Sequence, residues 1–480
     1  MSFLSPEFAV FLALGALAFH FARGVCRRLV LLLLSYAFYL TWNPRAALLL
    51  LGITVAVYFV AGALEKLSSA RKKLVLLLLS VAVLLLLLIF FKCAGLLARH
   101  YLTGGAGNAL TDIIAPIGLS YYLFKLMGYL LDVYWEKIPV QRNFLSLALY
   151  PSFFPQIMSG PIQRAGDFFG QLAQLDNQLP DNIVIGLRRI LFGLFKKVVV
   201  ADHISGMVDA VHANPAGFSP LELLFGAYCF AFQIYADFSG VTDIAIGIGL
   251  LFGIKGPENF NLPFWARNIQ EFWRRWHMSL TSWLTDYLFM PLRFSLRRFG
   301  EAGLCAAIFV TMIAVGVWHG PRMTYAVFGA LNGLYMAVSA LTLKKRNTWF
   351  QKRPLLAHVR MVAGPLLTFH LMVFALVIFR ADTLHSACQY VTHLIPGLQS
   401  AGISTLRFDR GLLHTRQIAL LLAALGFAAM EWVNWAGRQN TWTARFYSVP
   451  CFVRWAAYYI LIILIACSAQ ETRTFIYAQF

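Results

Sequence analysis

Two histidines of this sequence stand in surroundings that suit proton transfer. His277 lies within Glu271–Leu280, a stretch of ten residues that also carries two arginines and two tryptophans. His319 follows about forty residues later, in the motif Val317–Pro321 inside an apolar run. Ionisable side chains at membrane depth are costly and usually mark a pathway or a reaction centre. Histidine has a near-neutral pKa and is the usual general base. These two residues are therefore the candidates for catalysis in this sequence.

The composition indicates a membrane protein that crosses the bilayer several times. Of the 480 residues, 59% are hydrophobic and only 13% are charged, whereas soluble proteins carry about 25% charged residues. The net charge of +19 is scattered between apolar runs and is not gathered on a soluble domain. We therefore assign the positive charge to cytoplasmic loops and to contacts with anionic membrane lipids, and expect no nucleic-acid partner.

Sequence signals for several other chemistries are absent. The seven cysteines form no C-x-x-C pair, so neither a disulfide framework nor a metal site is predicted. No G-x-S-x-G elbow occurs, and no histidine is followed by an aspartate five residues later. The first apolar run precedes its arginines, which is the reverse of a cleavable signal peptide.

The elements that must position the histidines are helices, and we predict an all-α, polytopic fold. A segment of about 17–25 apolar residues can span a bilayer as a helix. We expect about eleven spanning helices, and the mixed segments at 143–160 and 183–201 are predicted to be re-entrant or interfacial. The apolar runs lie at 7–22, 28–42, 46–64, 74–91, 113–134, 221–254, 303–319, 324–342, 362–380, 416–435 and 452–470.

Basic residues predict the orientation of these helices, because lysine and arginine are enriched in cytoplasmic loops. Clusters at 23–28, 66–73, 293–298 and 344–360 are read as cytoplasmic. This places the N-terminus, the 381–415 loop and the C-terminal tail outside. The runs 303–319 and 324–342 then form a hairpin whose turn, with His319, lies away from the cytoplasm.

The segment 266–290 has the period of an amphipathic helix lying in the membrane interface. His277 falls between its two faces, and the period alone favours a surface anchor with an incidental histidine. His319 likewise has a structural alternative, a core histidine bonded to a carbonyl group. The apolar face comprises Phe272, Trp276, Leu280, Trp283 and Tyr287, and the opposite face Arg267, Arg274, Thr281 and Thr285.

Three charged residues within apolar runs are interpreted, from the residues alone, as structural. Asp237 and Asp243 stand six residues apart around Gly240, a spacing that does not place them on one helix face. We expect the 221–254 run to bend or split there, with the aspartates bonding freed backbone groups. Lys125 is predicted to pair with a carboxylate such as Asp132.

The motifs taken together resemble the membrane-bound O-acyltransferase family. The resemblance extends from about residue 113 to 385, and the bacterial alginate O-acetylation proteins and the D-alanyl transfer proteins of teichoic acid are the branches it suggests. The motifs are Phe154–Ile162, Phe195–Asp202, Tyr235–Gly240, Pro257–Phe260, Arg274–Leu280, Trp318–Gly320 and Phe379–Asp382.

The resemblance implies a function and a division of roles. His319 would be the catalytic histidine and His277 the second histidine of the site. The acyl group would come from a cytosolic thioester, acetyl-CoA or an acyl carrier, with no bound cofactor or metal. A periplasmic partner of the SGNH hydrolase type would pass it to a polysaccharide acceptor. The residues expected to bind donor or substrate are Arg274, Arg275, Trp276, Trp318, Asn259 and Asp243.

Departures from the family pattern leave the acyl group open. Arg293–Phe294 follow Pro291-Leu292, Pro321-Arg322 follow the second histidine motif, and Asn332 stands where a histidine is common. The segment Pro257–Asn261 leans toward the D-alanyl branch, while Phe195–Asp202 leans toward the acetyl branch.

We therefore predict an O-acyltransferase of the bacterial inner membrane that modifies an exopolysaccharide such as alginate, most simply with acetyl groups. One membrane domain, 1–480, would comprise N-terminal helices (1–110), a core with the motifs (113–385) and C-terminal helices (386–480). The alternatives are D-alanyl or another acyl transfer to a cell-wall polymer, a lipid or glycan transporter, and a scaffold that has lost activity.

Overall fold

The computed structural model describes residues 1–101, 116–176, 180–400, 417–437 and 448–468, and these residues form helices and connecting turns without a strand. The all-α fold is therefore confirmed. Within these described ranges, seven helices are long and apolar enough to cross a membrane, and Pro6–Phe21 and Leu420–Ala436 are shorter apolar helices. Each of the eleven predicted runs contains a helix, while the number that cross the membrane stays a prediction.

The chain divides into two compact units, which are described separately. Unit 1 comprises Met1–Leu191 and Val241–Glu258, and unit 2 comprises Phe192–Gly240 and Asn259–Phe480. The division of the chain into 1–110, 113–385 and 386–480 stays a prediction. One helix, α12 (Pro220–Leu251), belongs to both units.

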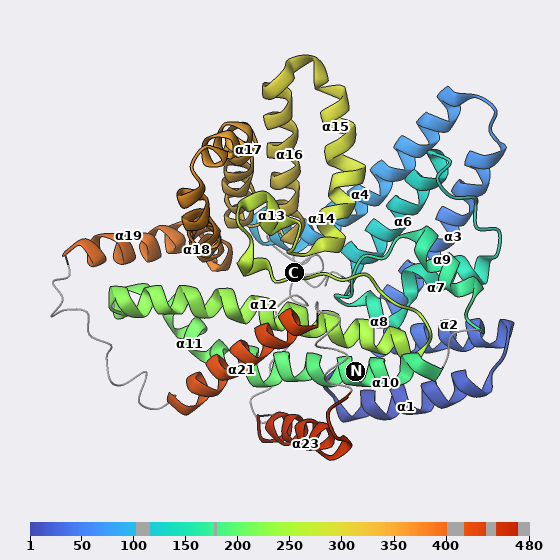
Figure 1. Ribbon diagram of the computed structural model, residues 1–480. Coiled ribbons are helices and arrows are strands. Elements are labelled where there is room, and N and C mark those ends of the chain that lie inside the picture. The colour runs from blue at the N-terminus through green and yellow to red at the C-terminus, as the bar shows by residue number, and fades with distance from the viewer. Residues whose placement is uncertain (102–115, 177–179, 401–416, 438–447, 469–480) are drawn as a thin grey trace. The chain divides into compact units, whose positions relative to one another are not determined.

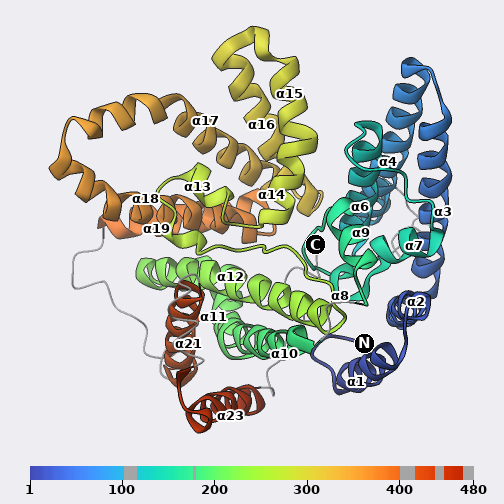
Figure 2. The same cartoon turned by 45° about the vertical axis from the view of Figure 1, so that its right-hand side comes forward.

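Unit 1 begins with helices whose start points are encoded locally. Ser5 and Asn43 cap the first turns with their side-chain oxygens, and a proline follows each at the first helical position, where it fits best. Helices α3 and α4 lie antiparallel in both views (Figures 1 and 2). The helices of unit 1 are α1 (Pro6–Phe21), α2 (Val25–Leu40), α3 (Pro44–Lys66), α4 (Ala70–Tyr101), α6 (Leu119–Tyr134), α7 (Phe144–Ser152), α8 (Phe154–Ile157), α9 (Ala165–Ala173) and most of α10 (Pro180–Leu194).

The buried lysine of unit 1 does not have the partner predicted for it. Lys125 donates to the carbonyl oxygen of Tyr150 at 3.0 Å and to Oε1 of Gln156 at 2.7 Å. Asp132 lies 3.9 Å from Lys137 instead. The prediction of a Lys125–Asp132 pair is wrong because seven residues of helix separate the two by about 10 Å along the axis.

Unit 2 is built around helices α16 to α18. Helices α15 and α16 run side by side in both views (Figures 1 and 2). The helical elements of unit 2, besides its part of α12, are η1 (Phe195–Ala201), α11 (Asp202–Ala213), η2 (Pro215–Gly217), η3 (Pro263–Trp265), α13 (Ile269–Trp273), α14 (Met278–Leu284), η4 (Thr285–Phe289), α15 (Met290–Ser295), η5 (Arg297–Phe299), α16 (Gly300–His319), α17 (Met323–Gln351), α18 (Pro354–Arg380), α19 (Leu384–Ser400), α21 (Gln417–Ala436) and α23 (Cys451–Ser468).

Helix α12 corrects two predictions about the aspartates. It is one continuous helix of 32 residues and does not split at Gly240. Asp237 binds Nζ of Lys197 at 2.7 Å, and Asp202 binds the same nitrogen at 2.9 Å. All three side chains are at most 3% exposed, so Asp237 balances a buried charge and does not cap a broken helix.

Part of the predicted 381–415 loop is helical, and its residues 401–415 lie outside the described part of the chain. Helix α19 starts where Thr383 and Ser386 exchange hydrogen bonds between side chains and backbone, each at 3.1 Å. The hydroxyl of buried Tyr390 donates to the carbonyl oxygen of Leu223 at 2.6 Å. A local cap and one buried anchor thus order this segment.

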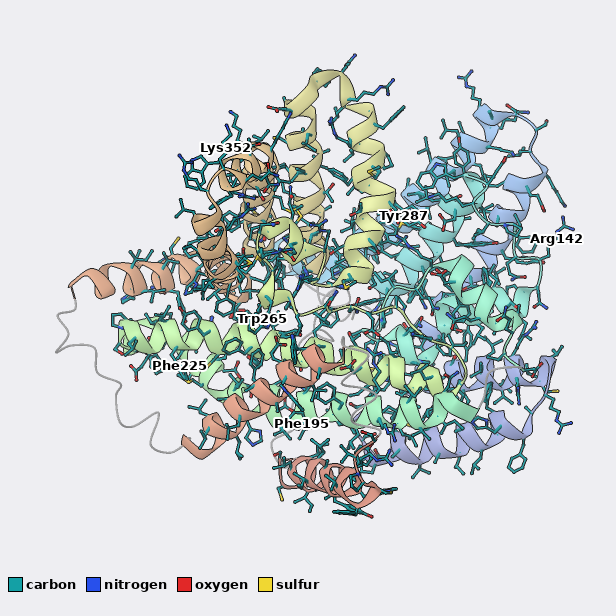
Figure 3. The ribbon with its side chains drawn as sticks, viewed as in Figure 1. Arg142, Phe195, Phe225, Trp265, Tyr287 and Lys352 are labelled. Atoms are coloured by element: carbon teal, nitrogen blue, oxygen red, sulfur yellow. The ribbon has the colours of Figure 1, made fainter. Side chains whose placement is uncertain are left out.

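Figure 3 shows that side chains cover both the inner and the outer faces of the helices. Among the labelled residues, Trp265 donates from Nε1 to Glu431 at 2.9 Å within unit 2. Arg142 of unit 1 pairs with Glu65 at 3.1 Å. These polar contacts tie connecting segments to the helices beside them.

Candidate active site

The first histidine motif is a pair of short helices joined by a tight turn, so the prediction of one amphipathic helix over 266–290 is wrong. Helix α13 ends at Trp273 and α14 begins at Met278. Between them, His277 adopts a left-handed conformation with φ of 45°, which is uncommon for a residue other than glycine.

Asn259 explains why the helix breaks at this position. Its carbonyl oxygen accepts from the backbone N–H of Met278 at 2.9 Å, and its side-chain oxygen accepts from that of Ser279 at 3.2 Å. These are the N–H groups that would otherwise bond within a continuous helix. A residue about twenty positions earlier thus caps α14 and turns His277 out of the helical path.

The turn directs His277 into the interior of unit 2. Its side chain is buried, with 1% of the residue exposed. The ring centroid lies 4.7 Å from that of Phe238 and 5.7 Å from that of Trp318, both in edge-on arrangements. Burial lowers the pKa of His277 to about 3, because the charged imidazolium loses its hydration there. The imidazole is neutral at physiological pH.

His319 is the last residue of α16 and is held in place by close packing with α17. A Cβ atom on Gly316 would lie 2.1 Å from the carbonyl oxygen of Tyr325, and one on Gly329 would lie 2.5 Å from that of Met312. Only glycine permits this approach. The imidazole of His319 lies 5.0 Å from Phe379 and 4.8 Å from Trp318, measured between ring centroids.

The two histidines line one narrow cavity within unit 2. Its volume is about 10 Å³, counted as the space open to the centre of a water molecule, which is room for about one water. Trp318 contacts both imidazole rings but is not among the residues that line the cavity, so its predicted role in donor binding stays a prediction. The lining residues are Ile234, Trp273, Trp276, His277, Leu280, Val315, His319, Phe328, Leu376 and Phe379.

Sequence reasoning missed several residues of this wall, most clearly Trp273. The indole Nε1 of Trp273 donates to Oδ1 of Asn332 at 3.2 Å, and Asn332 donates to the carbonyl oxygen of Phe328 at 2.9 Å. Asn332 is one of the departures from the family pattern, and here it orients a cavity tryptophan. The only available signal was the position of Trp273 within the Glu271–Leu280 motif.

The predicted donor-binding residues divide into two groups. Trp276 lines the cavity, and Asn259 shapes the turn beside it. Arg274 is exposed, whereas Arg275 forms an ion pair with Glu271 and donates to the carbonyl oxygen of Leu262 at 3.4 Å. Neither arginine lines the cavity, so in this structure Arg275 stabilises the turn.

Asp243 has a structural role in unit 1. Its carboxylate accepts from Nε of Arg189 at 2.9 Å, and the same arginine also pairs with Glu258. Asp243 is not among the residues that line the histidine cavity. Asp243 belongs to unit 1, whereas the cavity lies within unit 2, so its place in donor binding stays a prediction.

The other departures from the family pattern lie at the surface. Arg322 forms an exposed ion pair with Asp382 at 2.8 Å. Arg293 donates to the carbonyl oxygen of Gly300 at 3.2 Å, and Phe294 is 67% exposed. None of these side chains lines the histidine cavity.

This arrangement can support proton transfer in surroundings that contain little water. A neutral imidazole at the end of α16 can accept a proton from a hydroxyl group, and the aromatic walls keep bulk water away. The second imidazole, held in a strained turn, can donate or accept one hydrogen bond at a fixed position. Among the described residues, no three histidine, cysteine or acidic side chains gather as metal ligands.

Comparison with known proteins identifies the family of the chain. Residues 136–377, just over half of the sequence, match the membrane-bound O-acyltransferase family. A probable alginate O-acetylase of Pseudomonas aeruginosa is 34% identical over 372 residues, which cover 75% of this chain and 68% of that protein. A peptidoglycan O-acetyltransferase of Helicobacter pylori is 32% identical, with 82% and 79% covered.

A teichoic acid D-alanyltransferase of Bacillus subtilis is 31% identical over 57% of this chain and 71% of its own length. All three relatives are named as enzymes that transfer an acyl group, and the family match includes both histidine motifs. This chain therefore belongs to the membrane-bound O-acyltransferase family and is a multi-pass membrane acyltransferase.

Proposed function

We propose that this acyltransferase O-acetylates an exopolysaccharide at the bacterial inner membrane. The acyl donor in this proposal is a cytosolic thioester, either acetyl-CoA or a loaded acyl carrier. Similarity over about three quarters of the chain to proteins named alginate O-acetylases supports the choice of acetyl group and polymer.

The observation that carries the proposal is the cavity shared by the two histidines. In the proposed reaction His319 removes the proton of the acceptor hydroxyl as the oxygen attacks the thioester carbonyl carbon. The carbon–sulfur bond then breaks, and the thiolate leaves and takes up a proton, which gives an ester and a free thiol. A base positioned in this way typically contributes about 10²–10⁴-fold to the rate.

His277 has a positioning role in this proposal. Burial keeps its imidazole uncharged, so it serves as a hydrogen-bonding group rather than as a cation. Its edge-on contact with Phe238 and the cap from Asn259 fix the direction of the ring. A fixed dipole beside the reacting carbonyl stabilises developing charge without reorganising.

The narrowness of the cavity supports a short acyl group. Room for about one water favours two carbons over a long fatty chain, which would displace several aromatic side chains. D-Alanyl transfer to a cell-wall polymer is the second candidate, supported by the similarity to teichoic acid D-alanyltransferases. The identity of the ester on the polymer distinguishes the two candidates.

We further propose a periplasmic partner of the SGNH hydrolase type that receives the acyl group and passes it to the polysaccharide. In this arrangement the hydroxyl deprotonated by His319 belongs to the partner or to a carrier. A strain that lacks this partner would then lose polymer esters. The membrane enzyme would stop consuming thioester if the partner supplies the hydroxyl, and would continue if a carrier supplies it.

The test measures acyl esters on the surface polysaccharide of a deletion strain complemented with wild type, His319→Ala or a control. His393→Ala is a matched control, because His393 is exposed on α19 and bonds the carbonyl oxygen of Gln389 in its own helix. With equal amounts of protein in the membrane, His319→Ala is expected to leave about 1% of the wild-type ester or less. Full ester content with His319→Ala would make His319 structural and favour a transporter or a scaffold.

A further inference from the structure

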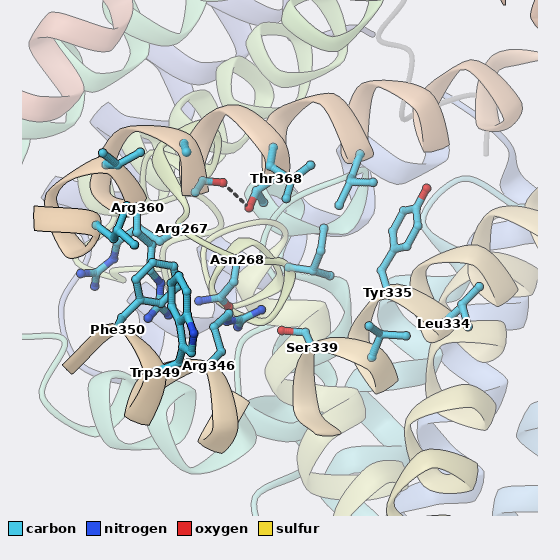
Figure 4. Close-up of a pocket in the computed structure, with 18 residues that line it drawn as sticks. Arg267, Asn268, Leu334, Tyr335, Ser339, Arg346, Trp349, Phe350, Arg360 and Thr368 are labelled. Carbon is cyan, nitrogen blue, oxygen red and sulfur yellow. Dashed lines mark hydrogen bonds between the residues drawn. The ribbon is translucent and has the colours of Figure 1, made fainter. Parts of the chain in front are cut away.

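A second pocket in unit 2, here called the arginine pocket, lies between α17 and α18 with residues 267–269 at its base (Figure 4). Its volume is about 670 Å³. It shares no lining residue with the histidine cavity. Its function must therefore be argued from its own side chains.

One end of the arginine pocket carries an excess of positive charge. Arg267, Arg346 and Arg360 contribute to its lining, and Figure 4 shows them close to Trp349 and Phe350. Arg267 is bonded to Glu271, which also pairs with Arg275. Two guanidinium groups of the pocket thus have no carboxylate partner among the described residues.

Arg346 is the most informative of these side chains. Its Nε and Nη2 atoms are enclosed, and no described residue offers either of them a hydrogen-bond acceptor. Arg360 is held differently, by Oδ1 of Asn347 at 3.0 Å and by stacking over Phe350 with 4.7 Å to the ring centroid. An enclosed guanidinium group without an acceptor is costly, and an anion with two oxygens would satisfy its planar pair of N–H donors.

The other end of the arginine pocket is apolar and opens toward the outside of the helices. Leu334, Val338 and Leu367 line it and are 51%, 51% and 63% exposed. They lie on α17 and α18, which are both apolar enough to cross a membrane. The twelve residues of helix from Leu334 to Arg346 measure about 18 Å, so the apolar wall is long enough for a fatty acyl chain.

We propose that the arginine pocket binds an anionic phospholipid, with its phosphate on Arg346 and Arg360 and one acyl chain along Leu334, Val338 and Leu367. A soluble phosphate compound would satisfy the arginines but would leave the apolar wall uncovered. A zwitterionic phospholipid would cover the wall and offer a phosphate, but it would also bring a positive headgroup charge beside the guanidinium groups. Trp349 at the charged end suits the headgroup level of a bilayer.

Bound lipid would also contact the segment that leads to the first histidine. Residues Arg267, Asn268 and Ile269 line the arginine pocket, and Asn268 caps α13 by accepting from the N–H of Glu271 at 3.0 Å. Helix α13 ends at the turn that holds His277. We therefore expect occupancy to stabilise the enzyme.

The test uses the purified full-length protein in a neutral detergent. Phosphatidylglycerol is titrated against phosphatidylcholine with the same chains, and binding is followed by native mass spectrometry and by the shift in melting temperature. We expect phosphatidylglycerol to bind selectively, and Arg346→Gln to weaken that binding about tenfold or more. Lys345→Gln removes the same charge from the neighbouring exposed position and should change the affinity less than about twofold.

A second variant keeps the arginines and closes the apolar wall. Val338→Trp replaces an exposed side chain, so it should leave folding intact while it blocks the acyl chain and weakens lipid binding. Unchanged lipid affinity in Arg346→Gln, or in Val338→Trp where Arg346→Gln cannot be purified, would overturn the proposal. Displacement of the lipid from wild type by coenzyme A or inorganic phosphate would overturn it in favour of a soluble phosphate ligand. None of these measurements depends on acyl transfer.

Discussion

The buried imidazole of His277 makes the stability of the fold depend on pH by an amount that can be worked out. Its pKa is lowered from 6.5 to about 3 by burial, partly opposed by a backbone hydrogen bond. The unfolded chain therefore takes up a proton as the pH falls below about 6.5, and the folded chain does not. The stabilising contribution is complete above that pH and is lost progressively toward about pH 3.

The magnitude follows from the distance between the assay pH and the unfolded pKa. The assay at about pH 5 lies about 1.5 pH units below the unfolded pKa. Protonation then stabilises the unfolded state by about 2 kcal/mol, at about 1.4 kcal/mol per pH unit. At about pH 7.5 the gain is close to zero. The variant His277→Asn lacks the titrating ring, and asparagine tolerates the left-handed conformation that His277 adopts.

The assay is equilibrium unfolding in detergent micelles at both pH values, followed by tryptophan fluorescence. The wild type should lose about 2 kcal/mol more than His277→Asn between about pH 7.5 and about pH 5. Burial also lowers the pKa of His212, to about 4, but that residue is present in both proteins and cancels in the difference. An equal loss in the two proteins would refute the burial of a neutral His277.

Two further predictions test the packing of unit 2. Lys197→Met leaves two buried carboxylates without their cation and should lower the free energy of unfolding by about 3–5 kcal/mol; an effect in thermal unfolding no larger than that of the exposed substitution Lys344→Met would contradict it. Gly316→Ala places a Cβ atom 2.1 Å from a carbonyl oxygen of α17 and should shift His319 enough to reduce polymer ester about 100-fold. Gly62→Ala, where nothing lies within 4 Å of the added atom, is the control, and equal ester levels in the two alanine variants would count against a fixed α16–α17 contact.

The helices could be predicted because their signal is local. The run 46–64 became α3 and the run 303–319 became α16, since a stretch of apolar residues folds as a helix wherever it lies in the bilayer. Capping residues such as Asn43 set the first turn within three positions. Apolar runs and helix caps depend only on residues that are close together in the chain, so they can be predicted from one sequence without related sequences.

The break at His277 could not be predicted because its cause is remote. The period of residues 266–290 is that of a helix, and the burial of Phe272, Trp276 and Leu280 follows that period. The N–H groups that would continue the helix bond to Asn259 instead. Nothing in residues 266–290 themselves shows whether these N–H groups bond within a helix or to Asn259.

The partners of buried charges were missed for the same reason. Asp237 bonds Lys197, forty positions earlier, and Lys125 bonds Gln156, thirty-one positions later. The position of each charge within an apolar run shows that it needs compensation. The choice of partner depends on which helices pack together, and this also determines that Phe328 and Phe379 form walls of the cavity.

The glycine contacts between α16 and α17 have a consequence for biosynthesis. The two helices are consecutive, with only Gly320, Pro321 and Arg322 between them, so their contacts join residues that leave the ribosome within seconds of each other. Contacts of short sequence separation form fastest. We therefore expect the α16–α17 hairpin to insert and pack as one unit, which sets the position of His319 before the walls from α18 are synthesised.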